Sequence, residues 1–150
     1  MVAALESGKI KKYVTDIPTA KIAQAKNVVA FPHLGASTAE SEDNCAVMAV
    51  KELLDFFENG NIKNSVNYPA CDAGVCESAA RYAICHKNVP NMLSQFTTVF
   101  SADGINIDNF VNKSRGEYAY SIIDASVASS DAIVEKLTAI DGVLKVRVVK

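Results

Sequence analysis

The sequence predicts a short α/β segment followed by an α+β domain, and two observations carry this prediction. Between residues 81 and 150, apolar residues alternate in four stretches and recur at helical spacing in two, in the order β-α-β-β-α-β. That order is the ferredoxin-like pattern, an antiparallel sheet with two helices on one face. Before residue 70, short apolar stretches precede one long amphipathic helix. Residues 70–80 lack sustained periodicity and are expected to form a linker between the two units.

The first unit, residues 1–69, should begin with a helix end and two strands. A helical pattern over residues 2–9 is closed by Gly8, and the stretches 12–16 and 27–31 are short and apolar, as buried strands are. A further strand-like stretch covers residues 62–68.

A long helix should connect these strands to the rest of the chain. Ser37 and Glu40 form a capping-box pattern that should open the helix, and Gly60 is placed to end it after Asn59. Its apolar residues share one face, whereas its charged residues lie mostly on the other. The apolar residues are Ala46, Val47, Val50, Leu53, Leu54 and Phe57.

The second unit has a clear order of elements. The predicted elements are a strand over 81–86, a helix with Pro90 in its first turn and Gly104 at its end, strands over 105–112 and 117–124, a helix capped by Ser129 or Ser130 and ended by Gly142, and a strand over 143–149. A turn at residues 113–116 joins the two middle strands.

The composition excludes several classes of function. Fifteen Lys and Arg against 17 Asp and Glu, with no basic block, do not favour a nucleic-acid partner. The longest apolar run of the long helix, Cys45 to Val50, is far shorter than the roughly 20 residues of a membrane span. Glu6 interrupts the place where a signal peptide would be apolar, so a cytoplasmic location is expected. The four cysteines show no C-x-x-C spacing, and no metal site is expected.

His33 is the first candidate for chemistry. It lies between a predicted strand end and a helix start, where loops hold functional groups over a crevice. Position alone leaves two interpretations open, a structural hydrogen-bonding histidine or a general base.

Four short segments of the first unit closely resemble the end of 3-phosphoglycerate dehydrogenases, in the D-isomer-specific 2-hydroxyacid dehydrogenase family. They are Pro32-His33-Leu34-Gly35-Ala36-Ser37-Thr38, Glu42-Asp43-Asn44, Asn59-Gly60 and Asn64-Ser65-Val66-Asn67-Tyr68-Pro69. The resemblance implies that the first unit is an incomplete α/β dehydrogenase segment whose long helix is a crossover helix. It also implies that His33 is the general acid/base for the substrate hydroxyl and that Asp16 contacts NAD near the nicotinamide. Asp16 could equally be a strand-end cap.

The first unit departs from the family in two respects. The family usually has a Glu that orients the catalytic His, but residues 17–32 contain no carboxylate, and Lys21 stands at the nearest corresponding place. No G-x-G-x-x-G occurs, so the loop that cradles a dinucleotide pyrophosphate is missing. NAD is therefore expected as the cofactor of a complete enzyme, and this chain alone is expected to be inactive.

The loop His86-Lys87-Asn88-Val89-Pro90-Asn91 is the second candidate site. It precedes a predicted helix, whose free N-H groups and dipole favour a carboxylate, although such a loop is often only a turn and a helix cap. With Gly104-Ile105-Asn106-Ile107 and the strand order, the loop resembles an ACT domain. The resemblance implies that the domain binds L-serine between two subunits, as in dehydrogenases of this kind. His86 and Asn88 would come from the loop and Asn106 from the facing subunit.

Three functions remain open from the sequence, namely part of an enzyme, an amino-acid sensor and a subunit-pairing element. The chain could be the carboxy-terminal portion of an NAD-dependent 3-phosphoglycerate dehydrogenase of serine biosynthesis, with an allosteric domain that senses serine or another small amino acid. Alternatively, residues 81–150 could be a non-catalytic ACT module that only pairs subunits through an edge strand. Asn91 stands where the family often has Gly, which favours pairing alone. A homo-oligomer is expected in either case, because the apolar face of the long helix needs a partner.

Overall fold

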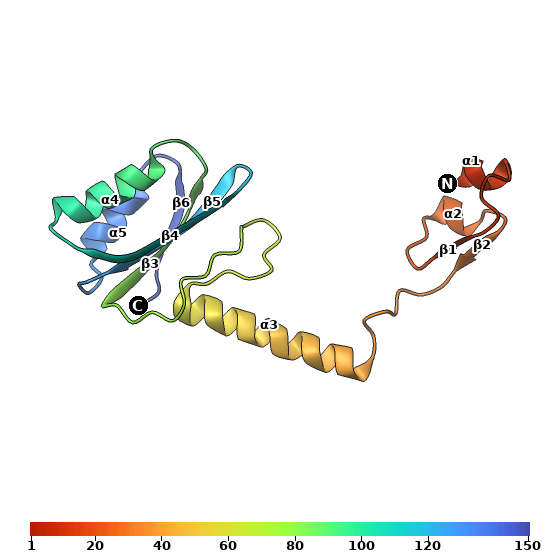
Figure 1. The fold of residues 1–150 in the computed structure, drawn as a ribbon, viewed down its shortest axis with the longest axis horizontal. Coiled ribbons are helices and arrows are strands. Elements are labelled where there is room, and N and C mark those ends of the chain that lie inside the picture. Colours follow the sequence, from red (N-terminus) through yellow and green to blue (C-terminus); the bar gives the residue numbers. More distant parts are fainter. The chain divides into compact units, whose positions relative to one another are not determined.

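The computed structural model describes all 150 residues, which form two compact units, Met1–Val47 and Met48–Lys150 (Figure 1). The first unit contains α1 (Val2–Glu6), β1 (Tyr13–Thr15), α2 (Ala20–Ala23), β2 (Val28–Ala30) and the start of α3 (Ala39–Asn59). The second unit contains the rest of α3, then β3 (Ala80–Lys87), α4 (Met92–Ala102), β4 (Ile107–Arg115), β5 (Tyr118–Ala125), α5 (Asp131–Thr138) and β6 (Val143–Val148).

The first unit is built on two parallel strands. β1 pairs with β2 in the register Tyr13 to Val28 and Thr15 to Ala30, which confirms both predicted strands. The short helix α2 between them was not predicted from the sequence. Its cap is Thr19, whose side chain accepts a hydrogen bond from the backbone N–H of Ile22 at 3.3 Å. A helix of one turn has too few residues to show a periodic pattern.

The long helix α3 is confirmed, but its predicted cap is wrong by one residue. The Thr38 hydroxyl, and not that of Ser37, accepts a hydrogen bond from the backbone N–H of Ser41, at 3.2 Å. Gly60 ends the helix with a φ of +74°, and a Cβ there would lie 3.1 Å from the Val149 side chain. Glycine is therefore required both by the left-handed backbone and by the close approach of Val149, which follows β6.

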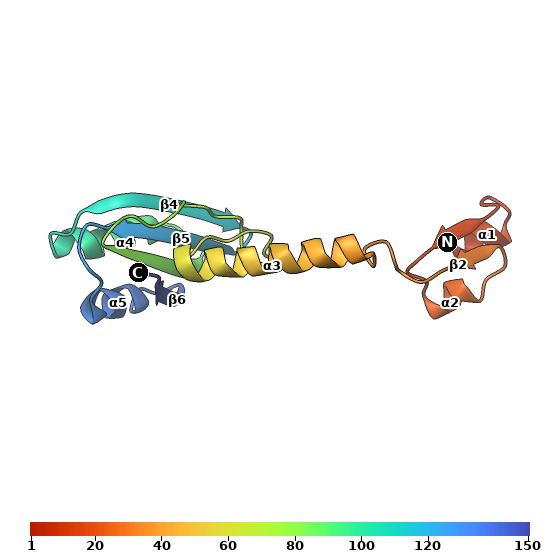
Figure 2. The ribbon, with the colours of Figure 1, turned by 90° about the horizontal axis from the view of Figure 1, so that it is seen from below.

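The second unit has the predicted β-α-β-β-α-β order. Its four strands form one sheet in the order β4-β5-β3-β6, and every neighbouring pair is antiparallel. Figure 2 shows α4 and α5 along this sheet. This topology is ferredoxin-like, as expected from the sequence.

The inner face of the sheet, which α4 and α5 cover, carries the main core. Alternate residues of β3, such as Tyr82 and Ile84, meet Phe96 and Phe100 of α4 and Leu137 of α5, and all five are almost fully buried. The period-2 pattern of the strands and the 3.6-residue pattern of the helices thus meet on this face.

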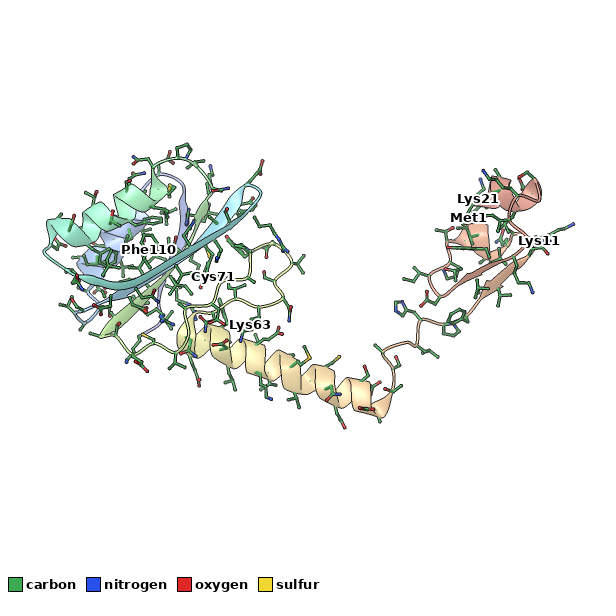
Figure 3. All side chains as sticks on the ribbon, in the orientation of Figure 1. Met1, Lys11, Lys21, Lys63, Cys71 and Phe110 are labelled. Atoms are coloured by element: carbon green, nitrogen blue, oxygen red, sulfur yellow. The ribbon has the colours of Figure 1, made fainter.

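The outer face of the sheet is covered by residues 56–76, which include most of the predicted linker over residues 70–80. Cys71 and Cys76 are 1% and 8% exposed, and Cys71 packs with Ala83 and Ile122 of the sheet (Figure 3). The strand predicted over 62–68 is absent, and only an isolated bridge joins Ile62 to Cys71. The outer face is itself apolar and must be removed from water, so this irregular segment packs on it.

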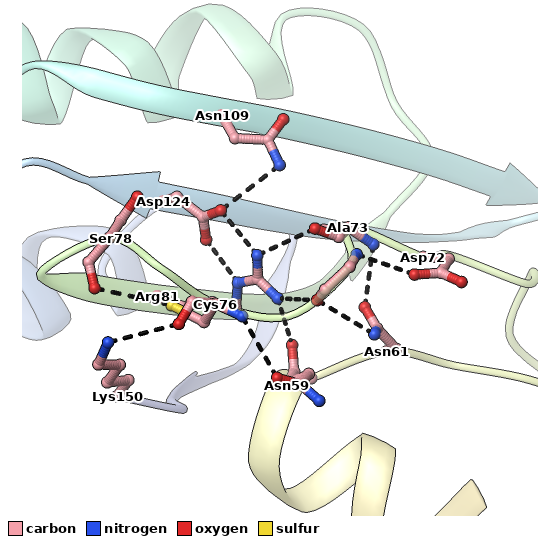
Figure 4. A network of polar contacts seen from close by, with 12 residues as sticks. Asn59, Asn61, Asp72, Ala73, Cys76, Ser78, Arg81, Asn109, Asp124 and Lys150 are labelled. Atoms are coloured by element: carbon pink, nitrogen blue, oxygen red, sulfur yellow. Dashed lines mark hydrogen bonds and ion pairs between the residues drawn. The ribbon is translucent and has the colours of Figure 1, made fainter.

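Arg81 fastens this segment to the sheet (Figure 4). Its guanidinium donates hydrogen bonds to the backbone oxygens of Asn59 at 2.9 Å, Gly74 at 2.7 Å and Ala73 at 3.1 Å. The carboxylate of Asp124, on the neighbouring strand β5, accepts the remaining donors. One buried side chain therefore joins the end of α3, the irregular segment and the sheet.

Candidate functional site

The loop between β3 and α4 is held against the β4–β5 turn by Asn88. The backbone N–H of Asn88 donates to the Glu117 oxygen at 2.9 Å, and its side-chain amide donates to the Gly116 oxygen at 3.0 Å. The residues of this loop from Lys87 to Asn91 are exposed. The loop is thus an accessible surface with a fixed backbone.

A pocket of about 330 Å³ lies beside this loop, lined by Lys87, Asn88, Val89, Glu117 and Tyr118. Lys87 at the end of β3 and Glu117 in the β4–β5 turn carry opposite charges, and neither takes part in a salt bridge. Sequence reasoning did not single out Glu117 or Tyr118. The predicted turn at residues 113–116 precedes both residues directly. It places them beside the loop only once β3 is known to pair with β5, because that pairing sets Tyr118 opposite Lys87.

The His86 ring faces the protein interior and not the surface of the loop. His86 belongs to β3, is 2% exposed, and packs edge-on against Phe96 with ring centroids 5.1 Å apart. Its Nδ1 lies 2.8 Å from the Lys87 carbonyl oxygen, and its Nε2 lies 3.0 Å from Ser121 Oγ. Because a carbonyl oxygen only accepts, Nδ1 carries the proton. Both ring nitrogens therefore have hydrogen-bond partners within the protein.

Asn91 has a left-handed backbone with a φ of +70°. Glycine and asparagine adopt this conformation at lower cost than other residues, so Asn91 is a conformational equivalent of the Gly often found there. Asn91 is also the N-cap of α4, but its side chain makes no capping hydrogen bond. The first N–H groups of α4 therefore lack a side-chain cap, next to the pocket-lining residue Val89.

Asn106 lies at the opposite end of the sheet from Asn88. Lys87 pairs with Tyr118 at one end, whereas Ile107 pairs with Ala125 at the other. The eight residues of β5 between these pairs span about 25 Å at roughly 3.4 Å per residue. The exposed side chain of Asn106 donates to Asp108 at 3.0 Å. One chain therefore does not bring Asn88 and Asn106 together.

Asp16 and the His33 loop follow the carboxyl ends of the two parallel strands. The register pairs Thr15 with Ala30, and the Phe31 N–H donates to the Thr15 oxygen at 3.2 Å. Asp16 is half-buried and His33 is exposed at this common edge. The carboxyl edge of parallel strands is where α/β folds bind ligands. Lys21 lies on α2, where it lines a separate pocket of about 640 Å³.

The residues present do not fit NAD. The chain has no glycine-rich loop between a strand and a helix, and its parallel sheet has only two strands. The backbone N–H cradle that holds a dinucleotide pyrophosphate is thus missing. No group of three or more His, Cys, Asp or Glu side chains is arranged to hold a metal ion. No helix is both long and apolar enough to cross a lipid bilayer.

The fold and these sites define a ferredoxin-like domain with a polar loop, joined to a parallel-strand segment with a histidine after the carboxyl end of its second strand. No known family model matches the chain. It is 28% identical over 122 residues to D-3-phosphoglycerate dehydrogenase of Haemophilus influenzae, a match that covers 81% of this chain and 30% of that protein. A putative D-3-phosphoglycerate dehydrogenase of Schizosaccharomyces pombe is 31% identical over 126 residues, 79% of this chain and 27% of that protein.

The D-3-phosphoglycerate dehydrogenase of Escherichia coli K12 is 26% identical over 133 residues, 86% of this chain and 32% of that enzyme. The chain is homologous to part of D-3-phosphoglycerate dehydrogenases, and it spans about a third or less of the length of these relatives. The ACT domain from GTP pyrophosphokinase of Chlorobium tepidum is similar in structure, with a TM-score of 0.41 and 24% identity over 46% of this chain and 94% of that one.

Proposed function

We propose that this chain is the carboxy-terminal portion of an NAD-dependent 3-phosphoglycerate dehydrogenase, and that residues 81–150 form an ACT-like domain that binds L-serine as an effector. The observation that carries this proposal is the pocket beside the Asn88 loop, on a chain homologous to part of such dehydrogenases. The two parts of the proposal have separate tests.

The pocket suits a small amino acid because its charges match a zwitterion. Lys87 favours a carboxylate, and Glu117 favours an ammonium group. The Asn88 amide fixes the loop and supplies polar atoms to the pocket. His86 acts as a positioning residue, because its ring holds the Lys87 carbonyl instead of facing the ligand.

Calorimetric titration with L-serine tests this site, and separate titrations with glycine and L-alanine serve as the comparison. We expect saturable heat that is largest for serine, and a loss of affinity of about tenfold or more in Asn88→Ala and Lys87→Gln. Lys113→Gln is the matched control, because Lys113 is exposed on β4 and does not line the pocket. Equal binding by Asn88→Ala and the unaltered chain would refute the assignment.

Asn106 would complete the site from a second copy of the chain, because it lies about 25 Å from the Asn88 end of its own sheet. A mixing experiment tests this arrangement. Asn88→Ala and Asn106→Ala chains should each bind serine poorly alone. Mixed and reassembled, they should recover part of the binding, since a mixed dimer contains one site with both asparagines. A site within one chain predicts no recovery.

The first unit is proposed to supply His33 as the general acid/base and Asp16 as a cofactor contact once the missing nucleotide-binding part is present. Both lie at the carboxyl edge of the parallel strands, which supports this assignment. In a complete enzyme that includes this segment, His33→Ala should abolish oxidation of 3-phosphoglycerate and leave NAD binding nearly unchanged. A variant that keeps most of its turnover would exclude the role of His33.

A second candidate function is subunit pairing without sensing. It is favoured by β4, which pairs only with β5 and leaves a nine-residue edge strand free, and by the exposed apolar side chains of α3. Light scattering should give a dimer or larger mass at micromolar protein, and a monomer would refute homo-oligomerisation. A clean dimer that shows no heat with serine would favour pairing over sensing.

A further inference from the structure

A second cavity, of about 520 Å³, lies on the outer face of the sheet in the unit Met48–Lys150. It is walled by α3 and by the segment after α3, with the sheet as its floor. The side chains that line it include Leu53, Phe56, Ile62, Tyr68, Cys85 and Tyr120. Its volume lies within the range of about 300–1,000 Å³ typical of small-molecule sites, and its lining is mainly apolar and aromatic, as in such sites.

Aromatic rings surround this cavity on two sides. Tyr68 and Tyr120 meet edge-to-face with ring centroids 6.1 Å apart, and Phe56 lies across on α3. Aromatic walls favour a planar ring, which they contact by edge-to-face or offset stacking.

The polar groups that line the cavity are uncharged or already paired. Burial raises the pKa of Tyr68 and of Tyr120 to about 12, so both phenols keep their protons at neutral pH. At the rim, Glu52 accepts a hydrogen bond from Asn64 at 2.6 Å. Lys63, labelled in Figure 3, is paired with Asp55, and the Nζ–Oδ2 distance is 3.1 Å. The main cavity therefore suits the uncharged body of a ligand.

A smaller cavity of about 180 Å³ shares lining residues with the first and carries two cations. It shares Phe56, Cys85 and Tyr120 with the main cavity and is also lined by Lys145 and Arg147 of β6. Arg147 lies over the Phe56 ring, with Cζ 4.2 Å from the centroid, and also donates to the Phe56 carbonyl oxygen. Neither cation has a carboxylate partner within 4.0 Å. Positive charge is thus concentrated in a cavity that shares aromatic walls with the main one.

We propose that these two cavities, which share Phe56, Cys85 and Tyr120, together bind a small aromatic carboxylate, with its ring between Phe56, Tyr68 and Tyr120 and its carboxylate at Lys145 and Arg147. The site is distinct from the Asn88 loop and does not depend on the proposed serine site. The charges favour this ligand class, since a neutral aromatic would leave the two cations without an anion.

Titration of the 150-residue chain with 2-naphthoate tests the proposal, with the neutral 2-naphthalenemethanol as the matched ligand. Calorimetry gives the affinity, and amide chemical shifts identify the site. We expect saturable binding of the carboxylate, at least about tenfold weaker binding of the alcohol, and shift changes at Tyr68, Cys85 and Tyr120.

Two pairs of variants distinguish binding of the carboxylate from binding of the aromatic ring. Lys145→Gln should weaken naphthoate binding by about tenfold, while Lys113→Gln, outside both cavities, should not change it. Ala49→Leu fills the cavity from the exposed surface of α3 and should weaken both ligands. Ala46→Leu on the same helix does not line the cavity and serves as its control.

Four results of the ligand titrations would overturn the proposal. They are non-saturable binding, shift changes confined to α4 and α5, equal affinity for acid and alcohol, and unchanged affinity in Ala49→Leu. Concentration-dependent shifts at Tyr68 and Tyr120 without ligand would also overturn it, because a second copy of the chain would then occupy the cavity. The shift measurement on the unaltered chain keeps the test decisive if a variant fails to fold.

Discussion

Arg81 and Asp124 form a two-point ion pair beneath the irregular segment that covers the sheet. Arg81 Nε lies 2.5 Å from Asp124 Oδ1, and Nη2 lies 2.7 Å from Oδ2, with both side chains buried on neighbouring strands. The hydrogen bonds to Asp124 raise the pKa of Arg81 above its usual value. The remaining guanidinium donors hold backbone oxygens of the cover, so the pair is tied to tertiary structure on both sides.

Removing the carboxylate should be costly because it leaves a buried charge without its partner. We expect Asp124→Ala to lower the free energy of unfolding by about 3–5 kcal/mol, measured by urea denaturation. Asp103→Ala is the control, because it breaks the Lys136–Asp103 pair, which is 2.6 Å long but partly exposed. That variant should cost less than about 1 kcal/mol. Similar costs for both variants would contradict the structural role of Arg81.

The left-handed backbone at Asn91 predicts an unusual tolerance to glycine. With a φ of +70°, Asn91→Gly should leave the free energy of unfolding nearly unchanged. Asn91→Val should lower it by about 1–2 kcal/mol, because a β-branched side chain is strained in this conformation. Thermal or urea unfolding of the two variants measures the difference. Equal stability of the Val and Gly variants would rule out a left-handed residue at this position.

The packed segment after α3 predicts an order of thiol reactivity. Cys45 is exposed on α3, whereas Cys71 is 1% exposed and burial raises its pKa to about 11. In the native chain, iodoacetamide should modify Cys45 first and Cys71 very slowly, because the thiolate is the reactive form. Peptide mapping by mass spectrometry gives the rates. Denatured protein is the control, and equal native rates would show that the segment is detached.

Buried Tyr120 predicts a loss of stability at alkaline pH. Burial raises its pKa to about 12, above the value of about 10 for an exposed tyrosine. The folded state thus holds the proton more tightly, so this contribution is complete below about pH 10 and is lost as pH rises toward 12. Its size is at most about 2–3 kcal/mol.

Tyr120→Phe tests this contribution. The variant should lose about 1–2 kcal/mol at pH 7, because the hydroxyl donates to the Gly60 oxygen at 2.8 Å. It should then show a shallower decline between pH 10 and 12 in urea unfolding. An unchanged alkaline decline would mean that Tyr120 does not titrate differently in the folded and unfolded states.

The parts of the fold that repeat regularly could be predicted from the sequence. The strands and helices after residue 80 were found with errors of a few residues, because each shows a clear period of 2 or 3.6. The cover of the outer face could not be predicted in this way. Residues 60–79 have no periodic pattern, and their order depends on the apolar outer face and on Arg81, which is distant in sequence from several of its partners.

The candidate site could likewise be predicted from the sequence only in part. The loop containing Asn88 was found from its residues and resemblance, but the orientation of His86 was not, since a strand residue can face either side of a sheet. The bulge between Cys85 and His86 further shifts the register with β6. That Glu117 lines the pocket could not be predicted, because its place beside the loop depends on the pairing of β3 with β5.

The sequence by itself determined the order of elements, the turns and caps to within about a residue, and the polar loop, because these depend on neighbouring residues along the chain. Only the tertiary structure decided that residues 56–76 cover the sheet, that His86 is buried, and that Lys145 and Arg147 lie at the end of an aromatic cavity. These features depend on which faces of distant segments meet, and that is set by the burial of apolar surface and the pairing of buried charge.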